Sequence, residues 1–238
     1  MSEQQEIEPG EDGREPVFNI AGIVLALIVL CAAVHALRVY VLTPRQDIEL
    51  LVRAAFIPLR YSGTYDIDLY AFTSPVTYSL LHGDILHLAI NMIWLAAFGS
   101  PLANRIGAVR FVAFWIFTSI AAVLLHYFLH MDDAALVIGA SGAVSGMMAA
   151  AARFGFSVDR SGNRRAFAGP LLPLPVVLGR RTVVVFLAVW FVVNLIAGLG
   201  YLVPGEARAI AWEAHVGGFV AGFFGIGLFD RRRRHVRH

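Results

Sequence analysis

Six separate stretches of this 238-residue chain are each long enough and apolar enough to cross a lipid bilayer. A helix needs about 20 predominantly apolar residues to cross a hydrocarbon core about 30 Å thick. The stretches that meet this requirement are 18–37, 83–103, 111–131, 134–152, 182–203 and 209–229. The sequence therefore predicts an all-α membrane protein, built as a bundle of six transmembrane helices.

The composition leaves little room for a separate soluble domain. Only 15% of the residues are charged, whereas about a quarter are charged in an average soluble protein. The net charge is only +2 and the basic residues flank the apolar stretches, so no nucleic-acid partner is expected. Cys31 is the single cysteine, which excludes an internal disulfide.

The polar segments divide the chain into two tails and one membrane domain. Residues 1–16 are acidic and poor in apolar side chains, which is typical of a disordered tail. A secretory signal begins with a basic region, so the apolar stretch after this acidic tail is expected to stay as a span. The membrane domain is expected to cover 17–230, with a long first loop at 38–82 and an arginine-rich loop at 153–181. Residues 231–238 form a basic tail.

Arginine placement predicts the orientation of the spans. Most arginines lie in the loop at 153–181 and in the tail at 231–238, and cytoplasmic loops are enriched in basic residues. With six spans these segments fall on one side, so both termini are expected in the cytoplasm. Arg38 and Arg45 follow the first span and oppose this pattern, but long loops cross largely regardless of charge. Within the first loop, 48–56 has the apolar spacing of a helix lying on the membrane surface.

Three of the predicted spans carry polar side chains at a similar depth. At 1.5 Å per residue, Ser141 lies about 10 Å from the outer end of the fourth span, and His215 about 9 Å from that of the sixth. His87 and Asn91 share one face of the second span and lie about 6 and 12 Å in. Polar groups inside a span are costly, and by default they indicate function. The four side chains are therefore predicted to form one site in the outer half of the membrane.

Small residues predict which helices touch. Gly142 and Gly146 are four residues apart in the fourth span, as are Gly218 and Gly222 in the sixth. Such spacing lets helix backbones approach closely in lipid. His215 lies seven residues before Gly222 and so shares its face, which predicts that His215 points at a close neighbour. A serine–histidine contact follows if that neighbour is the fourth span.

This set of residues has the chemistry of an activated nucleophile. A serine hydroxyl attacks efficiently when a base within hydrogen-bond reach takes its proton, here Ser141 and His215. The tetrahedral intermediate needs preorganised donors, which His87, Asn91 and the Ser141 backbone N–H can supply. Glu213 lies only two residues from His215, on another part of the helix surface, so a dyad without a third acid is expected.

Three motifs in this order resemble those of the rhomboid family. They lie on the second, fourth and sixth spans, and the resemblance covers roughly 75–229. The matching segments correspond to the family's HxxxxHxxxN segment, its GxSG nucleophile motif and its histidine helix: His82-Gly-Asp-Ile-Leu-His87-Leu-Ala-Ile-Asn91, Gly139-Ala-Ser141-Gly142 and Ala214-His215-Val-Gly-Gly218-Phe-Val-Ala-Gly222.

The resemblance implies an intramembrane serine protease of the bacterial type, located in the inner membrane, with no cofactor and no metal. Its dyad would be Ser141 and His215, with His87 and Asn91 as the side-chain part of the oxyanion hole. Supporting positions would be His82, Gly139, Gly142 and Gly218. The implied partners are single-span membrane-protein substrates and membrane lipid, while the oligomeric state stays open.

The resemblance also assigns the fifth span and the loop at 203–209 as substrate gate and cap. Two departures from the family pattern stand out. Ser145 occupies a position where some members have a tyrosine stacked on the histidine, and Ala103-Asn-Arg105 stands where an acid is expected.

Other functions fit parts of the pattern. The polar side chains would line a pathway in a transporter or channel, and facing histidines would ligate haem in a membrane cytochrome. An inactive rhomboid-like binding scaffold is a further alternative. His126 and His130, four residues apart, would suit a metal, although an interfacial histidine pair is favoured.

Overall fold

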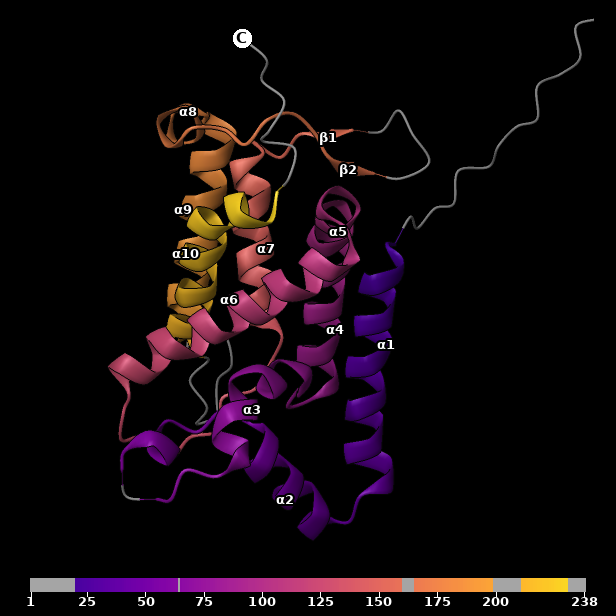
Figure 1. Ribbon diagram of the computed structural model, residues 1–238, viewed down its shortest axis with the longest axis vertical. Coiled ribbons are helices and arrows are strands. Elements are labelled where there is room, and N and C mark those ends of the chain that lie inside the picture. Colours follow the sequence, from indigo (N-terminus) through magenta and orange to yellow (C-terminus); the bar gives the residue numbers. More distant parts are fainter. Residues whose placement is uncertain (1–19, 64, 160–164, 199–210, 231–238) are drawn as a thin grey trace, which may run out of the picture.

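The computed structural model describes residues 20–63, 65–159, 165–198 and 211–230, and Figure 1 shows their arrangement. The predicted tails at 1–16 and 231–238 and the predicted cap at 203–209 lie outside the described residues. The described chain is mostly helical, so the predicted all-α class is confirmed. The α-helices are α1 (Gly22–Ala36), α2 (Pro44–Ala54), α3 (Leu69–Thr77), α4 (Ile85–Trp94), α5 (Ser100–Ile106), α6 (Ala108–Leu129), α7 (Ser141–Arg153), α8 (Leu174–Gly179), α9 (Arg181–Gly198) and α10 (Trp212–Phe229).

Five continuous helical stretches in the described chain are long and apolar enough to cross a membrane. They include α1 with its π-helical extension Leu37–Val41, and α4 joined through the π-helical turn Leu95–Gly99 to α5. The other three are α6, α9 and α10. Bundle helices α9 and α10 lie on one side of α7, with α4, α5 and α1 on the other, and α6 runs obliquely across (Figure 1).

The expected start of the first loop at Arg38 is wrong, because the first helix continues to Val41. Arg38 is buried rather than solvated, and its guanidinium donates to the Asp47 carboxylate at 2.7 Å and to the His82 carbonyl at 2.8 Å. These bonds satisfy the charge within the protein, so an arginine does not end the helix here.

The expected helix over 134–152 is also wrong in its first third. Residues 134–140 are not helical, and their backbone pairs instead with the first loop: Val137 and Phe56 exchange N–H···O bonds of 2.8 and 3.1 Å. Helix α7 therefore begins at Ser141 and is about 20 Å long, short of a full span. It is tolerated because neighbouring helices surround it, and every residue after Ser141 is buried.

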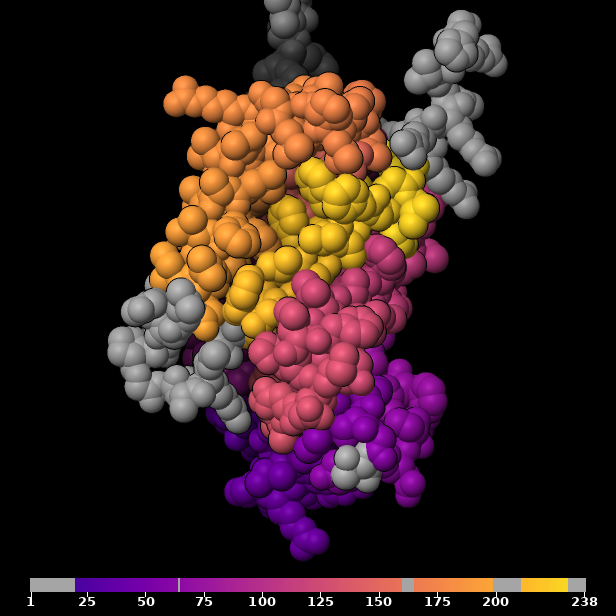
Figure 2. Space-filling view, turned by 90° about the vertical axis from the view of Figure 1, so that its left-hand side faces the viewer, coloured from indigo at the N-terminus to yellow at the C-terminus, as the bar shows by residue number. Residues whose placement is uncertain are grey.

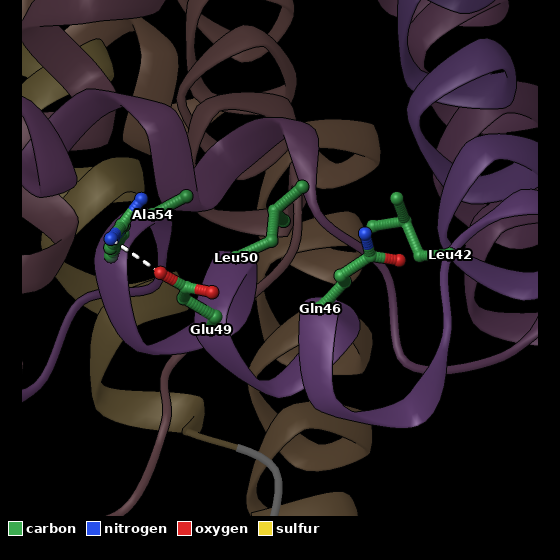
Figure 3. A pocket seen from close by; sticks show the side chains of 6 residues that line it. Leu42, Gln46, Glu49, Leu50 and Ala54 are labelled. Carbon is green, nitrogen blue, oxygen red and sulfur yellow. Dashed lines mark ion pairs between the residues drawn. The ribbon is translucent and has the colours of Figure 1, made fainter.

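The first loop covers one end of the bundle, as the space-filling view in Figure 2 shows in indigo and purple. Its helix α2 confirms the predicted helical segment, beginning at a capping box in which Thr43 and Gln46 satisfy each other's backbone N–H groups. None of its side chains is buried, so its placement on the membrane surface stays a prediction. A shallow hollow of about 280 Å³ beside α2 contains none of the predicted site residues (Figure 3), and it is lined by Leu42, Gln46, Glu49, Leu50, Arg53 and Ala54.

The opposite end of the bundle carries a two-stranded antiparallel hairpin that the sequence did not predict, β1 (Val158–Asp159) and β2 (Ala166–Phe167) (Figure 1). Arg105 on α5 fixes it, donating to the carbonyls of Phe167 and Gly169 at 2.8 and 2.9 Å. The same guanidinium bonds the carboxylate of Asp230, just after α10, at 2.7 Å. Arg105, in the segment where the resemblance leads us to expect an acid, thus has its own acidic partner.

Candidate active site

Ser141 is held at the start of α7 by the turn that precedes it. Gly139 has φ 128°, a conformation that L side chains rarely adopt, and its N–H donates to the Tyr78 carbonyl at 3.0 Å. A Cβ at Gly139 would lie 2.8 Å from His87 Nε2 and 3.5 Å from Ser141 Oγ. Only glycine fits here, because the backbone passes between the histidine and the serine.

His215 lies in the first turn of α10, and its Nε2 is 2.7 Å from Ser141 Oγ. The structure thus brings together two side chains that are 74 residues apart in the chain. The distance is that of a hydrogen bond in which an imidazole can take the hydroxyl proton.

Asn194 of α9 makes the other contact of the imidazole. Its Oδ1 is 2.5 Å from His215 Nδ1, and its Nδ2 donates to the Trp190 carbonyl at 2.7 Å. A carbonyl only accepts, so this second bond fixes the amide orientation and leaves Oδ1 to accept from His215. His215 therefore carries its proton on Nδ1, and Nε2 is free to accept the proton of Ser141.

Asn194 was not among the site residues predicted from the sequence. The sequence does carry a signal, since Asn194 is the one amide or ionisable side chain between Thr182 and Gly198 in an otherwise apolar span. The family's stacking tyrosine is replaced here by Ser145, and the bond from Asn194 supplies an alternative means of orienting His215.

The glycines let α7 and α10 touch backbone to backbone. A Cβ at Gly218 would overlap the carbonyl oxygen of Gly142, and a Cβ at Gly222 that of Gly146. On its other side, a Cβ at Gly142 would lie 2.6 Å from the Ala122 methyl carbon of α6. The contact predicted from the small-residue spacing is therefore present, and it sets the separation of Ser141 and His215.

Substituting Gly218 with alanine should separate the two helices. The added methyl meets rigid backbone rather than a movable side chain, and overpacking of this kind costs about 1–3 kcal/mol. Thermal unfolding in detergent should show a lower midpoint for Gly218→Ala. The matched control is Gly179→Ala, because a Cβ there has no atom within 4 Å. Equal midpoints for both variants would contradict the close-packing interpretation.

His87 approaches the serine from the first turn of α4. Asp84 caps this helix, accepting from the His87 backbone N–H at 2.8 Å. The ring Nδ1 of His87 accepts from the Gly83 N–H at 3.4 Å, which leaves the ring proton on Nε2, the atom beside Gly139. His87 thus has a ring N–H next to the glycine that precedes the nucleophile by two residues.

Asn91 lies one turn further along α4 and is buried. Its Nδ2 donates to the His87 carbonyl at 2.9 Å, so one of its two amide hydrogens is used within the helix. The second hydrogen is left for another acceptor. A role for Asn91 in the site stays a prediction.

His82 supports this arrangement from the chain just before α4. Its ring packs edge-on against His87 at a centroid distance of 5.2 Å. Burial is the main cause that lowers the pKa of His82 to about 3, and the nearby His87 is the second cause. His82 is therefore neutral at physiological pH. Its carbonyl accepts from Arg38 and lies 3.3 Å from His35 Nδ1, which ties the first helix to the site.

The fold and the site are those of a multi-pass helical membrane protein whose interior holds a hydrogen-bonded serine–histidine pair. Residues 71–232 match the family described as Rhomboid domain. That is more than half of the chain, and the chain belongs to the rhomboid family.

Two curated relatives share sequence similarity with this chain. Rhomboid protease GlpG of Serratia proteamaculans (strain 568) is 28% identical over 159 residues, which cover 67% of this chain and 48% of that protein. RHOMBOID-like protein 5 of Arabidopsis thaliana is 27% identical over 144 residues, covering 60% of this chain and 40% of that protein. The matched region is thus less than half of the length of either relative.

Proposed function

We propose that this protein is an intramembrane serine endopeptidase that cuts single-span membrane proteins in or near their transmembrane segments. The observation that carries the proposal is the 2.7 Å contact between Ser141 Oγ and His215 Nε2 inside a helical membrane bundle. Family membership and the printed name of the bacterial relative support the same reaction class.

The reaction begins when His215 Nε2 takes the hydroxyl proton and Ser141 Oγ attacks the scissile carbonyl carbon. The carbonyl oxygen gains the negative charge and is stabilised by the His87 Nε2–H, the free Asn91 amide hydrogen and the Ser141 backbone N–H. His215 then gives its proton to the leaving amine, and the first product departs. Water, deprotonated by His215, hydrolyses the serine ester and restores the hydroxyl.

The site is proposed to open toward the outer face of a bacterial inner membrane, with both termini in the cytoplasm. Ser141 lies at the end of α7 that adjoins the first loop, while the arginine-rich hairpin follows the other end (Figure 1). Cytoplasmic loops are enriched in basic residues, so this arrangement supports a nucleophile in the outer half of the membrane.

The proposal is tested with the purified full chain in liposomes and a panel of tagged single-span proteins. Cleavage of at least one of them, with an initial rate unchanged by EDTA well below the unfolding temperature, is the expected result. An inactive scaffold would bind a substrate without cutting it, and a transporter would move solutes without proteolysis. Loss of cleavage on chelation would contradict a serine–histidine mechanism.

Removing one oxyanion donor should slow the reaction without abolishing it. His87→Ala or Asn91→Ala should lower kcat about 10²–10³-fold, the usual loss for one such donor in a soluble serine protease. Asn104→Ala is the matched control, because Asn104 is only partly buried and its Nδ2 donates to the Arg165 carbonyl at the hairpin end of the bundle. Unchanged kcat in both test variants would remove His87 and Asn91 from the oxyanion hole.

Asn194 is proposed as a positioning residue that acts through His215. Asn194→Ala should lower kcat roughly 10–100-fold with KM nearly unchanged, because the imidazole loses its fixed tautomer. Asn194→Asp keeps an acceptor at the same position and should recover part of that activity. Steady-state kinetics separates the two effects. Equal rates for alanine and aspartate would show that the acceptor has no function in catalysis.

A further inference from the structure

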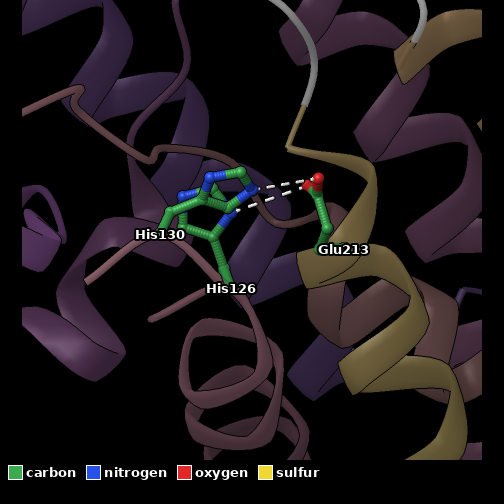
Figure 4. A group of neighbouring side chains, drawn as sticks. All are labelled: His126, His130 and Glu213. Carbon is green, nitrogen blue, oxygen red and sulfur yellow. Dashed lines mark hydrogen bonds and ion pairs between the residues drawn. The ribbon is translucent and has the colours of Figure 1, made fainter. Parts of the chain in front are cut away.

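A second cluster of histidine and carboxylate side chains lies apart from the serine, where the end of α6 meets the start of α10. His126 is in the last turn of α6, His130 is the residue that ends this helix, and Glu213 lies in the first turn of α10. Figure 4 shows both imidazole rings directed at the same carboxylate. One ligand atom from each residue lies within 4.8 Å of the other two.

Only one of the two imidazoles lies within hydrogen-bond distance of the carboxylate. His130 Nε2 hydrogen-bonds Glu213 Oε1 at 3.1 Å, whereas His126 Nδ1 is 3.7 Å from Oε2, too long for a hydrogen bond. Ligand atoms about 2.1 Å from a tetrahedral zinc ion are about 3.4 Å apart. The two measured separations, one to each carboxylate oxygen, lie on either side of that value.

The burial of His126 is an independent observation that points to a ligand. Only 6% of this residue is exposed, and neither ring nitrogen has a hydrogen-bond partner in the part of the chain that the structure describes. Buried polar nitrogens without partners are unfavourable, so they usually bind a group that is absent from the coordinates. A cation between His126, His130 and Glu213 would satisfy a ring nitrogen and balance the mostly buried carboxylate.

We propose that His126, His130 and Glu213 bind a divalent transition-metal ion, Zn²⁺ being the best match to two imidazoles and one carboxylate. Three protein ligands leave one position for water. The ion would clamp the end of α6 to the start of α10, two residues before His215, and takes no part in the proposed hydrolysis.

The test uses the full chain in detergent, carrying Ser141→Ala and lacking a histidine tag, with His235 and His238 changed to alanine throughout. After EDTA treatment, calorimetric titration with ZnCl₂ should give one site per chain. Saturating ZnCl₂ should raise the unfolding midpoint by roughly 5–10 °C. His126→Ala and Glu213→Gln should each weaken binding more than about 100-fold. The matched control, Asp132→Asn, neutralises an exposed acid in the adjacent turn and should bind as the parent does.

The visible absorption spectrum of the same protein with Co²⁺ tests the site without changing any of its three proposed ligands. Intense visible bands, which are typical of four-coordinate cobalt, are expected and should disappear on adding Zn²⁺. A weak six-coordinate spectrum, absence of saturable zinc binding, or equal affinity in Glu213→Gln would overturn the site. Because Ser141 is absent from the tested protein, the outcome is independent of the proposed peptidase activity.

Discussion

Replacing Ser141 with alanine should abolish cleavage of a single-span substrate while leaving the protein folded. The hydroxyl is the nucleophile of the proposed reaction, and His215 Nε2 lies 2.7 Å from it. Removing the nucleophile or its base in a soluble serine protease costs about 10⁶-fold in kcat. His215→Ala should be equally inactive, and the double variant no worse than either, because the two side chains act as one unit.

A second serine on α7, Ser145, provides the matched control. Ser145 lies one turn after Ser141 and is buried on the same short helix, so Ser145→Ala changes the same chemical group without touching His215. Gel-based cleavage in liposomes should show activity for Ser145→Ala and none for Ser141→Ala. Residual cleavage in Ser141→Ala above the no-enzyme rate would mean that another nucleophile performs the reaction.

Replacing Asp230 with alanine should cause the largest loss of stability. The Arg105 and Asp230 side chains are only 1% and 2% exposed and lie 2.7 Å apart. Arg105 also lies 4.0 Å above the Phe154 ring, so its guanidinium cannot turn to solvent without breaking this packing. Breaking a buried pair leaves an uncompensated charge and costs about 3–5 kcal/mol. Thermal and denaturant unfolding in detergent measure the change.

Two further variants test whether the loss of stability comes from the unpaired buried charge of Arg105. Glu49→Ala removes an ion pair with Arg53 that is about half exposed, and it should cost less than about 1 kcal/mol. The double variant Arg105→Met/Asp230→Leu removes both charges and should be clearly more stable than Asp230→Ala. If Asp230→Ala unfolds like the parent protein, the pair does not hold the hairpin end of the bundle.

Much of the fold and the dyad follows from sequence because lipid imposes simple local requirements. Apolar stretches of about 20 residues identified five long helical stretches to within a few residues at their ends. Four-residue glycine spacing predicted the close α7–α10 contact, since only a missing Cβ allows it. Ser141 and His215 were identifiable because hydroxyl and imidazole groups are rare and costly within such stretches.

The tertiary structure determined those backbone conformations and side-chain orientations that depend on residues distant in the sequence. Residues 134–140 are as apolar as a helix requires, yet they are not helical, because the first loop supplies hydrogen-bond partners for Val137 and Gly139. Arg38 remains in a helix because Asp47 and His82 satisfy it. The acceptor behind His215 is Asn194 of another helix, and no local spacing connects the two. Sequence alone thus determined which segments are long and apolar enough to cross the membrane and which polar groups they carry, while the orientation of those groups depended on contacts that form only when the helices pack.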